Sequence, residues 1–304
     1  MNPTRRRLLT LAPLPLLPAL QGCGTPLPLA SAGTAAGVDA QAVRWLRQCA
    51  DRHGRGAYQG LHDINVAYDG QWRPLIDRIQ PDVVDKPWRQ RSEERLLPRE
   101  GVIAQAHRGP SGRKQVLRRA GRARGQPGEV SVWYDGRPDA RDAVRTASAL
   151  VADCYVFFLL GPLWLDEQVA AGSTPLAMGE RVRVDGRACQ WVEAWLRPGF
   201  GLSTGDRASL AIDRDDLTCR RLRFTLEGHP TTQGAVAEVD WLELVQRHGV
   251  WWPSRSYERV VHPFPDFPAH DWRLTGLDVN RRYDASALQG PAFGGAAAAP
   301  AAPL

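Results

Sequence analysis

Apolar and polar residues alternate in short segments along most of the chain between residues 60 and 279. Leu222, Phe224 and Leu226, for example, alternate with Arg223 and Thr225, which is the period of a strand with one buried face. Asp-Gly pairs at 69–70, 135–136 and 185–186 are typical of the tight turns between such segments. The pattern predicts strands at 60–68, 101–107, 113–119, 129–134, 181–184, 187–196, 206–213, 217–227, 234–246, 249–262 and 270–279.

Two segments follow a helical pattern instead. In residues 38–53 apolar positions recur at helical spacing, Asp39 is placed to cap the first turn, and Gly54 ends it. A second helix is predicted from Asp139 to Leu160, where Gly161-Pro162 stops it. Its second half is apolar on all sides, which is typical of a buried core helix and too short for a membrane span.

These elements predict one domain, residues 38–283, of the mainly β with α (α+β) class. The economical arrangement is a strongly curved antiparallel sheet that wraps around the central apolar helix, because the concave face of the sheet needs an apolar partner. The Gly-, Ala- and Pro-rich residues 284–304 are predicted to be a disordered tail.

The N-terminus carries two export features. Thr4 to Leu9, with Arg5 and Arg6, resembles the twin-arginine signal, and Leu20 to Cys23 resembles a bacterial lipobox. The apolar stretch between them contains three prolines and is shorter than the ~20 residues that span a bilayer. We therefore expect a signal peptide at 1–22, acylation of Cys23 and a flexible tether at 23–37; cleavage near residues 30–32 is the alternative.

Net charge and composition bear on the class of ligand and on the state of the cysteines. Loss of the three signal-peptide arginines lowers the net charge from +6 to about +3. This charge is too small to indicate a protein that binds nucleic acid. Four cysteines remain after Cys23, and the sequence leaves open whether they form disulfides, in any of three pairings, or are buried thiols: Cys49, Cys154, Cys189 and Cys219. Eleven tryptophans against two methionines suit the lining of a cavity or a membrane interface.

No segment predicts an active site. Gly201 to Gly205 has the form G-x-S-x-G, but a strand-like segment follows Ser203 where a nucleophile elbow needs a helix. We therefore expect a hairpin loop and a protein that is not an enzyme. The scattered histidines and the acidic turn at 213–216 lack metal-ligand spacing, so no metal and no cofactor is predicted.

Several segments resemble one family. They are Val130 to Gly136, a strand that ends in an aromatic-Asp turn, and the paired strands 210–213, 220–227 and 236–244. With the order of helices and strands, they resemble the bacterial lipoprotein-localisation carriers and receptors and the envelope proteins that share their fold, over roughly residues 38–280. The resemblance implies an unclosed β-barrel, of about 11 strands by the segments above, with helices covering its mouth and an apolar cavity for acyl chains.

The densest apolar stretch locates the expected ligand site. If the sheet curves as predicted, this stretch and three strand residues face each other as the ligand-binding set: Phe157, Phe158, Leu160, Trp164, Trp195, Leu222 and Phe224. The hypothesis is an envelope lipoprotein that binds a lipid or other apolar ligand, in lipoprotein or lipid trafficking. The alternative is a structural or regulatory lipoprotein with a filled core that binds an envelope protein partner. Gly24 is not the Asp that retains many lipoproteins in the inner membrane, so by resemblance we expect the outer membrane, facing the periplasm.

Overall fold

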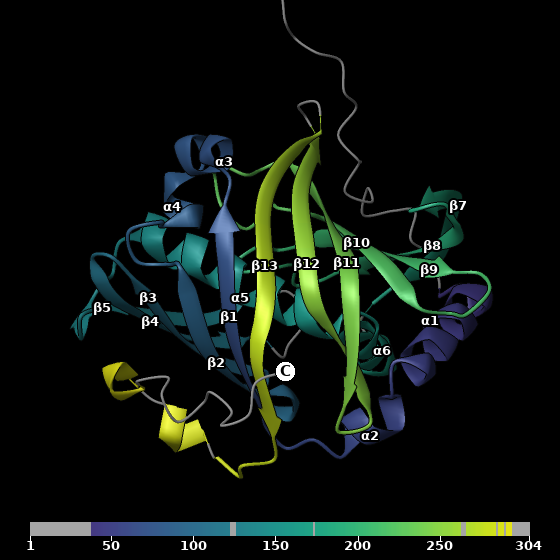
Figure 1. The fold of residues 1–304 in the computed structure, drawn as a ribbon, viewed down its shortest axis with the longest axis horizontal. Helices are drawn as coiled ribbons and strands as arrows, with labels where there is room; N and C mark the ends of the chain where they lie inside the picture. Colours follow the sequence, from purple (N-terminus) through teal and green to yellow (C-terminus); the bar gives the residue numbers. More distant parts are fainter. Residues whose placement is uncertain are drawn as a thin grey trace, which may run out of the picture.

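The computed structural model describes residues 38–121, 126–172, 174–262, 266–283, 285–288 and 290–293. Its strands pair antiparallel in one 13-stranded sheet, in the order β6-β5-β4-β3-β2-β1-β13-β12-β11-β10-β9-β8-β7 (Figure 1). The strands are β1 (Ile64–Trp72), β2 (Arg91–Leu97), β3 (Val102–Gly109), β4 (Gly112–Ala120), β5 (Gly128–Tyr134), β6 (Arg137–Pro138), β7 (Leu176–Val184), β8 (Arg187–Leu196), β9 (Asp206–Asp213), β10 (Cys219–Thr225), β11 (Val236–Arg247), β12 (Val250–His262) and β13 (Phe267–Val279).

The sheet consists of two runs of consecutive strands. The first run is β1 to β6 and the second is β7 to β13, and they meet where the first strand pairs with the last, β1 with β13. Within each run, neighbours in sequence are neighbours in the sheet, as expected for hairpin connections. β6 and β7 form the two edges of the sheet, so the barrel is unclosed.

The helices lie mainly on one face of the sheet. They are α1 (Ala40–Arg52), α2 (Arg55–Gln59), α3 (Pro74–Ile79), α4 (Pro81–Val84), α5 (Asp142–Leu160) and α6 (Pro162–Ala170), with 3-10 turns η1 (Pro98–Glu100), η2 (Ala285–Leu288) and η3 (Gly290–Ala292). In Figure 1, α5 passes behind β13, β12 and β11, and α3 and α4 stand at the end of the molecule where β1 ends. The predicted fold class is confirmed: a curled, unclosed antiparallel sheet covered by helices.

The two predicted helices form, and their ends have physical causes. Asp39 caps α1, because its carboxylate accepts hydrogen bonds from the backbone N–H groups of Gln41 and Ala42. Gly161 ends α5, and Pro162 begins α6 directly after it. By length and composition α5 could cross a membrane, but most of it is buried inside the protein. It is the core helix that the sequence predicts.

The structure differs from the predicted elements at several places. The strands β2 and β6 were not expected: β6 has only two residues, and β2 buries polar residues and so shows no apolar alternation. The short helices α2, α3 and α4, and α6, were also not expected. Asp69-Gly70 is not a turn but part of β1, where a Cβ on Gly70 would lie 2.7 Å from Trp272 Cβ.

The described part of the tail packs on the sheet. Leu288 and Phe293 are buried against Leu97, Val102 and other residues on the outer face of β2 and β3. This differs from the disordered tail predicted from residue 284, because two apolar side chains suffice to dock a short segment over an apolar patch.

Candidate ligand-binding site

The C-terminal half of α5 is packed tightly against the inner face of the sheet. Phe157 is fully buried, and its ring lies 6.1 Å from Phe224 and 5.6 Å from Trp164, between ring centroids. Phe158 lies 5.1 Å from Phe224, and Leu160 and Leu222 belong to the same core cluster. The structure thus brings six of the seven predicted residues together, but as closely packed core; their role in ligand binding stays a prediction.

Trp195 is the exception, and its predicted position is wrong. Along β8 the residues Val192, Ala194 and Leu196 belong to the inner core, so Trp195 points to the opposite, outer face. There the Arg207 guanidinium lies 5.6 Å from the Trp195 ring centroid. The partly exposed tryptophan is covered by an arginine instead of facing α5.

The apolar cavity lies beside the middle of α5, below α3 and α4. It has a volume of about 150 Å³. Its apolar wall includes Trp72, Ile76, Val83, Leu150, Phe158 and Val260. Phe158 is the one predicted ligand residue in the wall, so the open space is displaced from the expected site towards α3.

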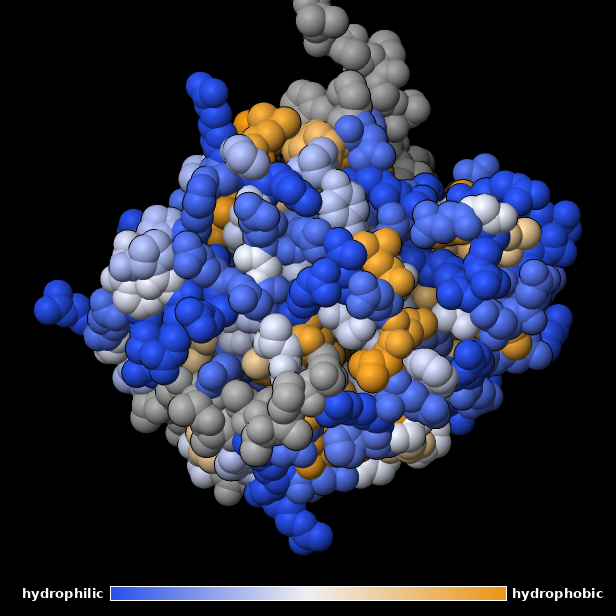
Figure 2. Space-filling view, in the orientation of Figure 1, coloured by the Kyte–Doolittle hydropathy of each residue, from blue (hydrophilic) through white to orange (hydrophobic). Residues whose placement is uncertain are grey.

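The mouth of the cavity is bordered by the segment 74–85 and the loop between β10 and β11. Gln80, after α3, makes two hydrogen bonds across this border: its amide donates to the Thr231 carbonyl at 2.7 Å and accepts from the Thr231 hydroxyl at 2.5 Å. Leu75 and Ile79 of α3 are 50% and 39% exposed, a large fraction for apolar side chains. In Figure 2, hydrophobic surface appears near the end of the molecule that carries α3, on a largely hydrophilic face.

One acid lines this mostly apolar space. Glu258, on β12, has its pKa raised to about 7 by desolvation, although the Arg89 charge opposes the rise. Sequence analysis did not identify Glu258 or Arg89. The available signal was an acid at an inward position of a strand, between the outward Tyr257 and Arg259.

The inner face of β2, β3 and β4 is polar; we call these the polar inner strands. Glu94 and Gln105 are cross-strand partners with 1% and 0% exposure, and His107 and Lys114 follow as another pair. Burial raises the pKa of Glu94 to about 7 and holds the pKa of His107 well below its ordinary value. Lys114 Nζ lies 2.7 Å from Asp85 Oδ2, yet burial still lowers the pKa of Lys114 to about 8.

A buried ion pair ties this polar wall to α5. The Arg118 guanidinium on β4 donates to both carboxylate oxygens of Asp153, at 2.8–3.2 Å, and to the Gly201 carbonyl at 2.7 Å. The Gly201 N–H donates back to Asp153 at 2.7 Å. Gly201 has φ +63°, and a Cβ there would lie 2.7 Å from Leu150 N, so only glycine fits this loop against α5.

Gly201 is the first residue of the G-x-S-x-G segment, which forms this loop. It connects β8 to β9, both strands, as predicted. Ser203 Oγ donates to the Gly205 carbonyl at 2.8 Å and accepts from the Gly205 N–H at 3.1 Å. Ser203 is therefore turned into its own loop and stabilises it.

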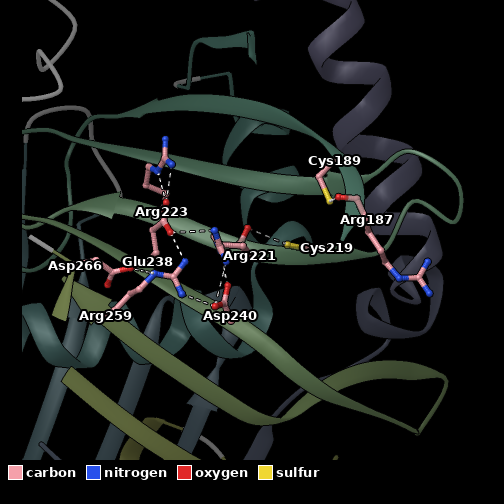
Figure 3. Close-up of polar contacts among 9 residues, drawn as sticks. All are labelled: Arg187, Cys189, Cys219, Arg221, Arg223, Glu238, Asp240, Arg259 and Asp266. Atoms are coloured by element: carbon pink, nitrogen blue, oxygen red, sulfur yellow. Dashed lines mark hydrogen bonds and ion pairs between the residues drawn. The ribbon is translucent and has the colours of Figure 1, made fainter. Parts of the chain in front are cut away.

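The outer face of the C-terminal strands carries a network of ion pairs (Figure 3). Glu238 on β11 pairs with Arg221, Arg223 and Arg259, and Asp240 pairs with Arg221 and Arg259. The pairs alternate in sign across three neighbouring strands, so the long arginine side chains cover the sheet. The arginine stems thereby bury the two carboxylates, with Glu238 at 4% and Asp240 at 6% exposure.

The cysteines outside the signal region are buried free thiols: Cys49, Cys154, Cys189 and Cys219. The structure thus favours the thiol alternative over disulfides. Burial raises the pKa of the Cys49 and Cys154 thiols well above the ordinary value, which disfavours the reactive thiolate. Arg5, Arg6 and Cys23 lie outside the described residues, so export and acylation stay predictions. Among the described residues no group of three or more metal-binding side chains occurs.

Comparison with solved structures finds similar folds. A LolA-superfamily protein from Nitrosomonas europaea is 9% identical, with a TM-score of 0.48 and coverage of 82% of this chain and 97% of its own. A DUF1329-family protein from Desulfovibrio piger is 12% identical, with a TM-score of 0.48 and coverage of 82% and 98%. A domain described as outer membrane lipoprotein-sorting, from Vibrio parahaemolyticus, is 8% identical, with a TM-score of 0.46 and coverage of 82% and 97%.

The first and third of these are described in the terms of the family that the sequence resembles. No protein-family model matches the chain, and no curated protein matches it in sequence. The similarity concerns the arrangement of strands and helices.

Proposed function

We propose that this protein is an envelope lipoprotein that holds an apolar ligand, such as an acyl chain, in the cavity below α3 and α4. The observation that carries the proposal is the cavity of about 150 Å³, whose wall is mostly apolar and whose mouth carries exposed apolar side chains. A soluble domain gains stability by filling such a space with its own side chains, so an open apolar cavity favours a ligand.

The size of the cavity limits what it holds in this conformation. Ligand pockets commonly measure about 300–1,000 Å³, and an engineered apolar cavity of about 150 Å³ holds a molecule of the size of benzene. The cavity thus takes the end of an acyl chain, and a whole chain needs the segment 74–85 to move outward. The two Gln80–Thr231 hydrogen bonds are the contacts that such a movement breaks first.

The membrane connection is part of the proposal. We infer from the sequence that Arg5 and Arg6 direct export and that acylated Cys23 anchors the protein, at the outer membrane and facing the periplasm. Cys23→Ala should move the protein from the membrane to the soluble periplasmic fraction. Unchanged fractionation of this variant would contradict the anchor.

A second candidate follows from the packed end of α5. Phe157, Leu222 and Phe224 leave that part of the inner face filled, which suits a structural or regulatory lipoprotein whose partner is an envelope protein. We propose no catalytic role in either case, since the Ser203 hydroxyl bonds within its own loop.

The experiment that separates the two candidates is mass spectrometry of lipids extracted from protein purified from its own envelope. Under the ligand proposal one lipid class co-purifies with the protein. Ala235→Trp places a large side chain in the cavity wall and should remove that lipid, whereas Leu242→Trp, at an exposed position of β11, should not. A lipid-free wild type supports the filled-core candidate.

A further inference from the structure

Arg89 is a buried arginine beside the cavity, and its guanidinium is only partly hydrogen-bonded. Arg89 is 4% exposed; it donates to the Val83 and Val84 carbonyls at the C-terminal end of α4 and, at 3.4 Å, to the Tyr155 hydroxyl. Its Nε has no hydrogen-bond partner, and among the described residues no carboxylate lies within 4.0 Å of its nitrogen atoms. The Arg89 charge faces the rings of Trp72 and Tyr155, whose centroids lie 5.2 Å and 5.7 Å from Cζ. A buried cation that has aromatic faces but no paired carboxylate leaves an anionic partner favourable.

Other unpaired polar groups surround the same place. Gln105, fully buried on β3, has neither amide atom hydrogen-bonded, and the Ser148 hydroxyl on α5 is also unpaired. Together with Arg89 they line a narrow recess between β3, β4 and α5. On its other side Arg89 lines a recess of about 10 Å³ with His270, whose buried Nδ1 is likewise unpaired.

Both recesses share walls with the apolar cavity. Val83 and Val151 line both the cavity and the first recess, while Trp72 and Tyr155 line both the cavity and the second. A molecule in the cavity therefore meets apolar walls along most of its length and, behind these shared side chains at one end, unpaired polar groups. This is the pattern of an amphipathic ligand, not of a hydrocarbon alone.

We propose that Arg89 binds the carboxylate of a fatty acid whose hydrocarbon chain lies in the apolar cavity. This assignment rests on the proposed function and narrows the ligand to single-chain anionic lipids. A guanidinium forms short, charge-assisted hydrogen bonds with a carboxylate, and the unpaired Nε–H supplies one of them. The Ser148 hydroxyl and the Gln105 amide supply neutral donors beside it.

Size and charge select this head group over others. The recess beside His270 has a volume of about 10 Å³, close to that of one water molecule, so the shared side chains must shift to admit even a carboxylate, and a sugar or a substituted phosphate needs a larger shift. The nearest acids, Glu94 and Glu258, have pKa values raised to about 7 by burial, so below neutral pH they leave the Arg89 charge to the ligand.

The test compares two fluorescent probes of one chain, cis-parinaric acid and the corresponding alcohol, on the full-length protein. At about pH 6 the free acid is ionised while Glu94 and Glu258 are mostly protonated. The wild type should bind the acid about tenfold or more tightly than the alcohol, as a charge-assisted hydrogen bond requires. Arg89→Lys should keep the preference, and Arg89→Gln should lower the ratio of acid affinity to alcohol affinity to about one.

The control is Arg78→Gln, which removes the same charge from an exposed position of α3. It should keep the preference for the acid. Equal binding of acid and alcohol to the wild type overturns the assignment but leaves the apolar-ligand proposal standing, and binding of neither probe overturns both. If Arg89→Gln still prefers the acid, the carboxylate binds at another residue and the assignment is wrong. If Arg89→Gln does not fold, the acid-to-alcohol affinity ratios of the wild type and of Arg89→Lys still test the assignment.

Discussion

The two runs of strands present different side chains to the same helix. On β8 to β11, which we call the apolar inner strands, the residues that face α5 are Leu, Ala, Ile, Val, Phe and Trp, with Leu210, Leu222 and Phe224 at or below 1% exposure. On the polar inner strands β2 to β4 the corresponding positions include Glu94, Gln105 and Arg118, equally buried. One α-helix is therefore held by close packing on one side and by an ion pair on the other.

The apolar inner strands mainly stabilise the fold, whereas the polar inner strands carry groups of the proposed ligand site. Close-packed apolar side chains stabilise a fold strongly and leave no room, so the end of α5 that packs on the apolar inner strands is filled. Buried polar groups add little net stability and are unfavourable when unpaired, yet several unpaired ones gather beside Arg89. The cavity lies beside α5 where α3 and α4 meet β12 and β13, next to the recesses that the polar inner strands line.

The largest effect is expected from breaking the ion pair on the polar side. Arg118→Met leaves Asp153 and the Gly201 carbonyl without their partner, and should lower the free energy of unfolding by about 4–5 kcal/mol in urea denaturation. Arg118→Met with Asp153→Leu should recover a large part, because no unpaired charge is then buried. Arg223→Met, on the outer face, is the control and should cost about 1 kcal/mol. Equal losses for Arg118→Met and Arg223→Met would contradict the comparison.

The apolar side is tested by two aromatic residues from the predicted site. Phe157→Ala empties a fully buried position and should cost about 3–4 kcal/mol, measured in the same denaturation experiment. Trp195→Ala, on the outer face below Arg207, should cost about 1–2 kcal/mol despite the larger side chain. A larger loss for Trp195→Ala would mean that Trp195, not Phe157, belongs to the core.

The buried acid on the polar side gives a pH-dependent effect. The pKa of Glu94 is raised from 4.5, its ordinary value, to about 7 in the folded protein, so the folded state binds the proton more tightly than the unfolded chain. Its contribution to the free energy of unfolding is therefore most favourable below pH 4.5 and decreases as the pH rises to about 7.

Glu94→Gln removes that decrease. The variant should gain stability over the wild type between about pH 4 and pH 8, by up to about 3 kcal/mol. Urea denaturation at several pH values measures this, with Glu129→Gln, an exposed position on β5, as the control. If the difference in free energy of unfolding between Glu94→Gln and wild type stays constant across this range, the pKa of Glu94 is not raised in the folded protein.

The smallest effect concerns the loop that joins the two sides. Ser203 is 6% exposed and its hydroxyl makes two hydrogen bonds with Gly205, so Ser203→Ala should cost about 1 kcal/mol. The sequence alone predicts no more than about 0.5 kcal/mol, the value of an ordinary surface position. A shift in urea midpoint distinguishes the two. Loss of a hydrolase activity in this variant would contradict the proposal that the protein is not an enzyme.

The apolar side could be predicted from the sequence, and the polar side could not. Alternation identifies β10 and β11 most clearly, because their inner residues are apolar and the outer residues between them are charged. In β2 the inner residues Ser92 and Glu94 are polar, and Leu97 faces outward under the tail, so the segment shows no apolar face of its own. Buried polarity removes the signal on which strand prediction depends.

The site was predicted in part for a related reason. The apolar density of α5 identified Phe157 and Phe158, which do face the sheet. Trp195 was assigned to the wrong face because Trp191 and Trp195 make the outer face of β8 look apolar, while Val192 and Ala194 line the inner one. The cavity itself depends on α3 and α4 meeting β12 and β13, segments far apart in the chain, and no local pattern specifies that contact.

Whether the cavity below α3 and α4 holds an acyl chain can be measured by titrating cis-parinaric acid into three proteins. They are the wild type, Ala235→Trp in the cavity wall, and Leu242→Trp at an exposed position of the same β11 region. We expect saturable binding to the wild type and to Leu242→Trp, and binding weakened at least about tenfold in Ala235→Trp with its unfolding midpoint preserved. Equal binding to all three folded proteins would contradict it.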